Sequence, residues 1–159
     1  DLEGQRARLA AKNADNQPAV RAGIQPGQVM VARGIAGVDG QALEDSTSKP
    51  ESGGILLGYR RGAHLHVTMA TAPQASDRGW RYLFKRSARH HQEIALHQWN
   101  ESGRKIDYLG EWHTHPELHP SPSATDLSEW RKICSQRQAP MVFLIMGWSG
   151  ELWLGLQED

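Results

Sequence analysis

The chain has 159 residues, a length that suits one compact domain with its own core. Its 18 basic and 18 acidic residues balance to a formal net charge of zero, which gives no indication of a nucleic-acid or membrane surface. The single cysteine, Cys134, excludes an internal disulfide and a metal site built mainly from thiolates. The longest apolar run, residues 141–147, is far shorter than a membrane span. We therefore expect a cytoplasmic protein that binds neither nucleic acid nor membranes.

The first 50 residues give weak structural signals. Residues 1–25 are polar and rich in Ala and Arg, which favours at most a short helix or a linker. Residues 28–33 are predicted to form a short strand, and residues 34–50 have the Gly, Asp, Ser and Thr content typical of a loop. We therefore expect an N-terminal extension and lead-in segment over residues 1–50, followed by a core over residues 51–159, within one domain.

From residue 51 onward, the hydrophobic pattern predicts alternating strands and helices. The predicted strands span residues 55–60, 65–69, 106–112, 141–146 and 152–156. The two predicted helices begin at the capping residues Ser87 and Ser123, and the first ends near Gly103. This order indicates an α/β or α+β domain with a central mixed sheet and about two main helices.

The stretch that indicates chemistry is Glu111-Trp112-His113-Thr114-His115-Pro116, at the end of a predicted strand. His113 and His115 lie two positions apart, so both side chains point to the same side of the strand and can bind one metal ion. Asp126 lies in the first turn of the helix that Ser123 begins, where it can supply a third ligand. Three protein ligands leave one coordination position open, which is typical of catalytic zinc.

A catalytic zinc site also needs a group that moves protons. Zinc lowers the pKa of a bound water from about 15.7 toward 7, and a nearby carboxylate can then accept its proton. Glu51 is the candidate, because residues 52–54 after it are small enough to allow close approach of the backbone. Ser123 can donate a hydrogen bond to a developing oxyanion, although it also has the position of a helix N-cap. Glu111 points to the same face as His113, so it is either a rival base or a group that orients a ligand histidine.

Together, these separated elements resemble the JAMM (JAB1/MPN/Mov34) family of zinc metallopeptidases. The resemblance covers residues 51–156, and it occurs in the family's order with the family's spacing between the second histidine and the serine. It rests on Glu51-Ser52-Gly53-Gly54-Ile55-Leu56-Leu57-Gly58, His113-Thr114-His115-Pro116 and Ser123-x-x-Asp126. The resemblance implies a cytidine-deaminase-like α-β-α sandwich and one zinc ion per chain. The roles that it implies are zinc ligands for His113, His115 and Asp126, general base for Glu51 and oxyanion stabiliser for Ser123.

The segment from Tyr108 to Pro116 is most similar to bacterial members of this family. Those are encoded beside ubiquitin-activating-like (E1-like) and conjugating-like (E2-like) proteins, in antiphage or ubiquitin-like modification operons. The resemblance therefore implies cleavage after the C-terminal glycine of a ubiquitin-like protein, in a conjugate or a precursor, with the E1-like and E2-like proteins as further partners. Two alternatives stay open, namely a catalytically silent MPN-type scaffold and a hydrolase that acts on a sulfur-carrier protein or a small amide. Residues 1–50 depart from the family because they are longer and less apolar than its usual lead-in helix.

Overall fold

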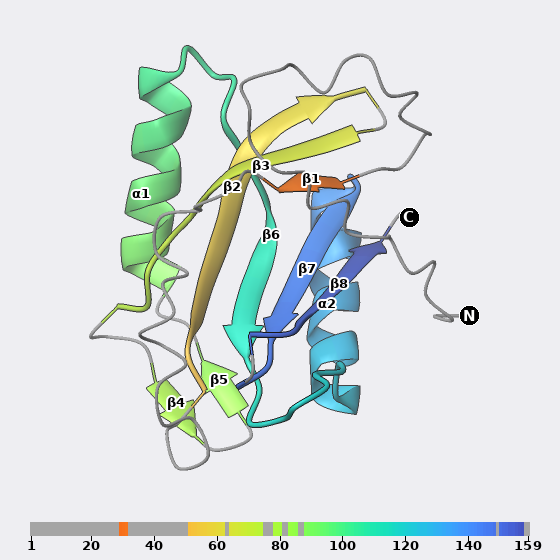
Figure 1. Ribbon diagram of the computed structural model, residues 1–159. Coiled ribbons are helices and arrows are strands. Elements are labelled where there is room, and N and C mark those ends of the chain that lie inside the picture. The colour runs from red at the N-terminus through yellow and green to blue at the C-terminus, as the bar shows by residue number, and fades with distance from the viewer. Residues whose placement is uncertain are drawn as a thin grey trace, which may run out of the picture.

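The main sheet has six strands in the order β1-β3-β2-β6-β7-β8, and it mixes parallel and antiparallel neighbours (Figure 1). The computed structural model describes residues 29–31, 51–62, 64–74, 78–80, 83–85, 88–148 and 150–157. The strands of the sheet are β1 (Val29–Val31), β2 (Gly53–Arg61), β3 (His64–Ala70), β6 (Asp107–Thr114), β7 (Met141–Met146) and β8 (Leu152–Gln157). Two further strands, β4 (Arg78–Trp80) and β5 (Leu83–Lys85), pair only with each other.

Helices α1 (Ala88–Glu101) and α2 (Ala124–Arg137) cover opposite faces of the sheet (Figure 1). Alternate residues of β7 divide between two buried clusters, since successive side chains of a strand point to opposite faces. Val142 and Leu144 belong to one cluster. Phe143 and Ile145 belong to the other, which also holds Trp130 of α2. This arrangement confirms the α/β fold with helices on both faces of a mixed sheet. Neither described helix is long and apolar enough to cross a membrane.

The predicted elements of the second half of the chain are all present in the structure. Strand β6 extends two residues beyond its predicted end at 112 and so includes His113. Strands β2 and β3 are antiparallel, and the turn between them includes Gly62, whose φ of 62° is in the left-handed region that glycine adopts without steric cost. Strands β4 and β5 were not predicted, because three residues are too few to show an alternating pattern. Strand β1 pairs in parallel with β3, while the expectations for residues 1–25 and 34–50 lie outside the described residues.

The order of the strands brings the start of β2 to the end of β6. These strands are antiparallel, and Gly53 faces His113 across the pair. Strand β7 lies parallel to β6 on its other side, and α2 is the connection between them. The end of a central strand, flanked by a crossover helix, is a position where open α/β sheets commonly bind ligands. The residues just before β2, at the end of β6 and at the start of α2 therefore meet at one place.

Gly53 is the point of closest approach between β2 and β6. A Cβ atom there would lie 2.3 Å from the carbonyl oxygen of Trp112 and 2.9 Å from the Cα of His113, so the strands would have to separate. We expect Gly53→Ala to lower the free energy of unfolding by about 1–3 kcal/mol and to reduce activity, because His113 moves with the strand. Gly62→Ala is the comparison, since a Cβ at Gly62 meets nothing within 4 Å and only its positive φ opposes the change. Urea unfolding measures the stability of the two variants. If Gly53→Ala were as stable as the wild-type protein, β2 and β6 would not be in the close contact described.

Candidate metal centre

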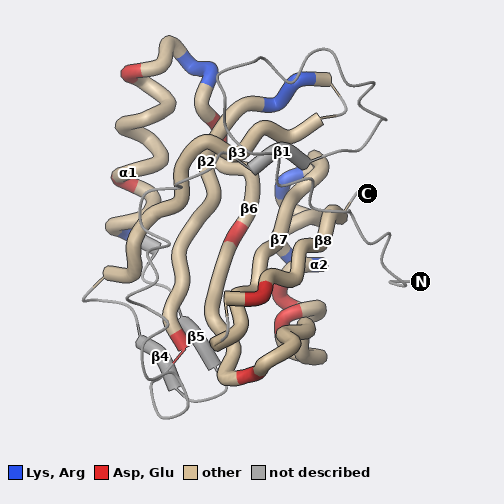
Figure 2. The backbone as a smooth tube through the Cα atoms, viewed as in Figure 1, with Lys and Arg blue, Asp and Glu red and all other residues tan. Residues whose placement is uncertain are grey.

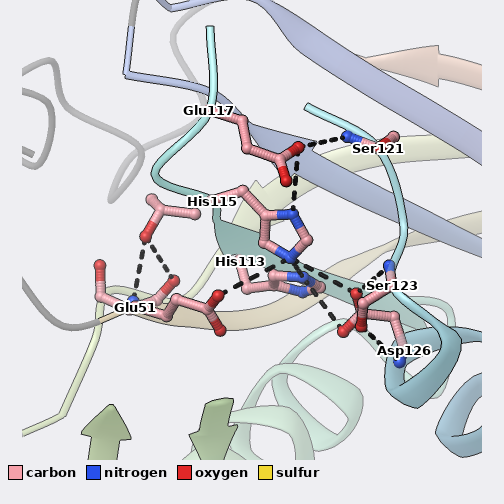
Figure 3. A network of polar contacts seen from close by, with 9 residues as sticks. Glu51, His113, His115, Glu117, Ser121, Ser123 and Asp126 are labelled. Carbon is pink, nitrogen blue, oxygen red and sulfur yellow. Dashed lines mark hydrogen bonds and ion pairs between the residues drawn. The ribbon is translucent and has the colours of Figure 1, made fainter. Parts of the chain in front are cut away.

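His113, His115 and Asp126 converge at the end of β6 (Figure 3). One potential ligand atom from each lies within 4.8 Å of the other two. The two histidine Nε2 atoms are 3.0 Å apart, and oxygens of the Asp126 carboxylate lie 3.4 Å from each of them. Both histidines are only 7% exposed. Two imidazole nitrogens and a carboxylate directed at one point fit a divalent cation, and no other group of three such side chains comes together within the described ranges.

Backbone hydrogen bonds fix the two histidines from both sides. The N–H of His115 donates to the carbonyl oxygen of Met146 at 2.9 Å, which continues the pairing with β7. The N–H of Thr114 donates to the carbonyl oxygen of Ser52 at 2.8 Å, and the Thr114 hydroxyl accepts from the N–H of Ser52 at 3.0 Å. The end of β6 is therefore held between β7 and the residue that follows Glu51.

The start of α2 orients the third ligand through a capping box. The Ser123 hydroxyl oxygen accepts from the N–H of Asp126 at 3.2 Å, and the N–H of Ser123 donates to Oδ2 of Asp126 at 2.7 Å. The predicted N-cap at Ser123 is therefore present. Because this cap uses the hydroxyl oxygen as an acceptor, the O–H can still donate to another group. Capping and a role in stabilising an oxyanion are thus compatible.

The surroundings shift the pKa values of all three candidate ligands. Burial, aided by the charge of His115, lowers the pKa of His113 to about 4 against the attraction of Asp126, so His113 is neutral near pH 7. Burial raises the pKa of Asp126, but the hydrogen bond to His115, the charge of His113 and the Ser123 hydrogen bonds outweigh it and lower this pKa to about 2. Burial lowers the pKa of His115, but the hydrogen bond to Asp126 and the negative charges of Glu51, Asp126 and Glu117 raise it overall above 6.5.

Glu51 lies beside the ligand group without belonging to it. Its Oε1 atom is 3.9 Å from Nε2 of His115, and the residue is 8% exposed. Burial raises the pKa of Glu51 to about 7; His115 opposes the shift, and the charges of Asp126 and Glu117 add to it. A carboxyl group whose pKa is near neutrality can both accept and return a proton at neutral pH. A strongly shifted pKa next to a possible metal centre is also typical of functional carboxylates.

Two other acidic residues lie on the same stretch of chain as the histidines. Glu111 is on β6, and its carboxylate accepts a hydrogen bond from the Tyr108 hydroxyl at 2.9 Å. Glu117 was not singled out from the sequence, yet its Oε2 lies 3.8 Å from Nδ1 of His115 and accepts from the N–H of Ser121 at 3.2 Å (Figure 3). A loop residue has no periodicity that predicts the direction of its side chain, so sequence reasoning had no signal for this contact.

Comparison with known proteins shows where this arrangement belongs. The chain matches prokaryotic homologs of the JAB domain over residues 41–154. A "CD-NTase/cGAS isopeptidase" of Pseudomonas aeruginosa is 44% identical over 109 residues, which make up 67% of this chain and 69% of that protein. The "Probable metalloprotease y4qB" of Sinorhizobium fredii is 30% identical over 115 residues, which make up 66% of this chain and 70% of that protein. The solution structure of a Desulfitobacterium hafniense protein matches with a TM-score of 0.51 at 18% identity, covering 83% of this chain and 90% of that one, which supports the fold alone.

Two histidines and an aspartate that meet at the end of a central strand of an α/β sheet suit a metal-dependent enzyme. The chain belongs to the family of prokaryotic JAB-domain homologs, as the resemblance predicted. It is a metallo-isopeptidase of that family.

Proposed function

We propose that this metallo-isopeptidase uses zinc, held by His113, His115 and Asp126, with Glu51 as the general base. The observation that carries the proposal is the buried Glu51 carboxylate, with a pKa raised to about 7, beside a buried His-His-Asp group. A zinc ion bound there would polarise the scissile carbonyl and lower the pKa of water. The predominantly neutral state of His113 near pH 7 suits a ligand, because imidazole binds metals through an unprotonated nitrogen.

Glu51 would act twice in one reaction cycle. Its carboxylate accepts a proton from the water that attacks the amide carbon, and its carboxyl group then donates that proton to the departing lysine amine. The C–N bond breaks, and the products are a carboxylate and a protonated lysine amine, which together hold the oxygen and both protons of the attacking water. The burial that raises the pKa of Glu51 favours the protonated carboxyl group, which is the form that must hold the proton between the two transfers.

Ser123 would stabilise the oxyanion that forms when water adds to the carbonyl carbon. We expect Ser123→Gly to lower kcat by about 10²-fold or more, because an oxyanion donor is lost. The free energy of unfolding should fall by only a few tenths of a kcal/mol, since glycine is tolerated at an N-cap. Ser123→Ala should lose the donor and about 1 kcal/mol of stability as well, whereas Ser123→Thr retains a hydroxyl. Steady-state kinetics measure the role of Ser123 as an oxyanion donor, and thermal unfolding measures its role as a helix cap. If Ser123→Gly had the kcat of the wild-type protein, Ser123 would act only as the cap.

For the substrate, we propose a lysine-linked conjugate that contains a CD-NTase/cGAS-type protein. Support comes from the name of the Pseudomonas aeruginosa relative, which refers to such a protein and to an isopeptide bond. A conjugate or precursor of a ubiquitin-like protein, cut after its C-terminal glycine, is the second candidate, supported by the sequence around His113. The chemistry at the amide is the same in both, so contacts away from the amide would decide between them.

The test is to incubate the zinc-loaded protein with each purified conjugate and to identify the products by mass. We expect cleavage of the CD-NTase/cGAS-type conjugate at its isopeptide bond, and no cleavage by Glu51→Gln. Cleavage of the ubiquitin-like conjugate alone would assign the second substrate. If a short isopeptide-linked peptide pair were cleaved but neither conjugate, both substrate proposals would be wrong while the proposed chemistry would stand.

A further inference from the structure

Three exposed apolar side chains lie on segments that adjoin the metal centre. They are Leu118, Trp148 and Leu152, which are 45%, 43% and 37% exposed, and we call them the apolar rim. In the part of the chain that the structure describes, the other exposed large hydrophobic residue is Leu96, on α1, the helix that covers the other face of the sheet from α2. Large apolar side chains exposed beside a catalytic site are typical of a surface that contacts another molecule.

The backbone connects the rim to the ligand loop. The N–H of Trp148 donates to the carbonyl oxygen of Glu117 at 3.1 Å, next to Leu118. Leu152 pairs with Met146, whose carbonyl oxygen accepts from the N–H of His115. The turn between β7 and β8 and the loop after His115 are therefore joined by hydrogen bonds, so the rim has a fixed position relative to the proposed ligands.

Acidic side chains flank the rim. Glu117 and Glu151 are about half exposed, and the Glu151 carboxylate also contacts Nδ1 of His119 at 2.7 Å. Figure 2 shows Asp and Glu around the end of the sheet that holds the metal centre, whereas Arg60 and Arg61 lie at the far end of β2. A partner that covers the rim should therefore present an apolar side chain with basic residues around it.

We propose that the apolar rim docks the CD-NTase/cGAS-type protein of the conjugate, and that this protein contacts the rim through an apolar side chain flanked by basic residues. This inference rests on the proposed function. A folded protein that is attached at the scissile amide must place some of its surface close to the loop after His115, which carries Leu118. A second copy of the chain fits less well, because a two-fold contact would bring the acidic groups of both copies, Glu117 and Glu151, close together.

The experiment compares a whole conjugate with a short isopeptide-linked peptide pair as substrates. The rim variant is Leu118→Ser combined with Trp148→Ser, and Leu96→Ser is the matched control, since it also removes an exposed leucine. We expect the rim variant to lower kcat/KM for the conjugate at least tenfold, mainly through KM, and to leave the peptide rate within twofold of wild type. Leu96→Ser should change neither rate.

Binding separates docking from catalysis. The Glu51→Gln protein should bind the immobilised CD-NTase/cGAS-type conjugate, and adding the two rim substitutions should weaken that binding at least tenfold. This measurement tests the rim even if the wild-type protein cleaves no conjugate, an outcome that would instead contradict the proposed function. Four outcomes would each overturn the docking proposal. The first two are equal losses of kcat/KM on conjugate and peptide, and binding of the conjugate that the rim substitutions leave unchanged. The other two are no detectable binding of the conjugate, and a wild-type dimer that the rim substitutions convert to a monomer.

Discussion

Glu51→Gln is expected to reduce kcat for isopeptide hydrolysis by about 10³-fold while the protein still binds one zinc ion. Glutamine has nearly the shape of the glutamate side chain but cannot accept a proton from water at neutral pH. The ligand group does not include Glu51, whose nearest oxygen is 3.9 Å from Nε2 of His115. Single-turnover kinetics and metal analysis on the same preparation measure both quantities.

Glu111→Gln is the matched control for this substitution. The two residues are the rival bases, but the Glu111 carboxylate accepts a hydrogen bond from the Tyr108 hydroxyl, which a glutamine oxygen can also accept. We expect Glu111→Gln to retain most of the activity. If Glu111→Gln lost activity and Glu51→Gln retained it, the two roles would be exchanged. If Glu51→Gln lost zinc as well, Glu51 would act as a ligand rather than a base.

The convergence of the three candidate ligands could be predicted because each depends on a local pattern. Two histidines separated by one residue share a face of a strand, and a Ser-x-x-Asp sequence forms a capping box that orients the aspartate. The position of Glu51 is different, because Ser52 and Thr114 are 62 residues apart and meet only through the pairing of β2 with β6. Composition gives no information about that pairing, so the expectation for Glu51 rested on the small residues that follow it and on the resemblance to a family.

Features that depend on contacts between loops were not predicted. Glu117 comes close to His115 because the loop after β6 is hydrogen-bonded to the turn after β7. The apolar rim has the same origin, since neither the Trp148 turn nor the Leu118 loop shows a periodic pattern. Register and turn geometry place these side chains, and a single sequence reports neither across long separations. The contacts of Glu117 and the proposed docking surface are therefore revealed only by the three-dimensional structure.

Asp126→Asn is expected to abolish most of the stabilisation that zinc gives to the folded protein. A ligand that binds only the folded state raises the free energy of unfolding by about 2.7 kcal/mol at a concentration of 100 times its Kd. Asparagine can still accept the hydrogen bond from the N–H of Ser123 through its side-chain oxygen, so the helix cap should remain. It lacks the negative charge that attracts a dication. The zinc-induced rise in Tm should therefore largely disappear, while the Tm without zinc changes much less.

The pH dependence of zinc stabilisation gives a further check on the same site. His115 has a pKa raised above 6.5, and it must lose its proton before its ring nitrogen can bind zinc. Zinc stabilisation should therefore be fully present above the pKa of His115 and should decline as the pH falls through it, with affinity lost about tenfold per pH unit for one competing proton. His113, with a pKa of about 4, adds a second competing proton only in more acidic solution. A zinc-induced Tm shift that is constant from pH 8 to pH 5, or equal in wild type and Asp126→Asn, would place the metal elsewhere.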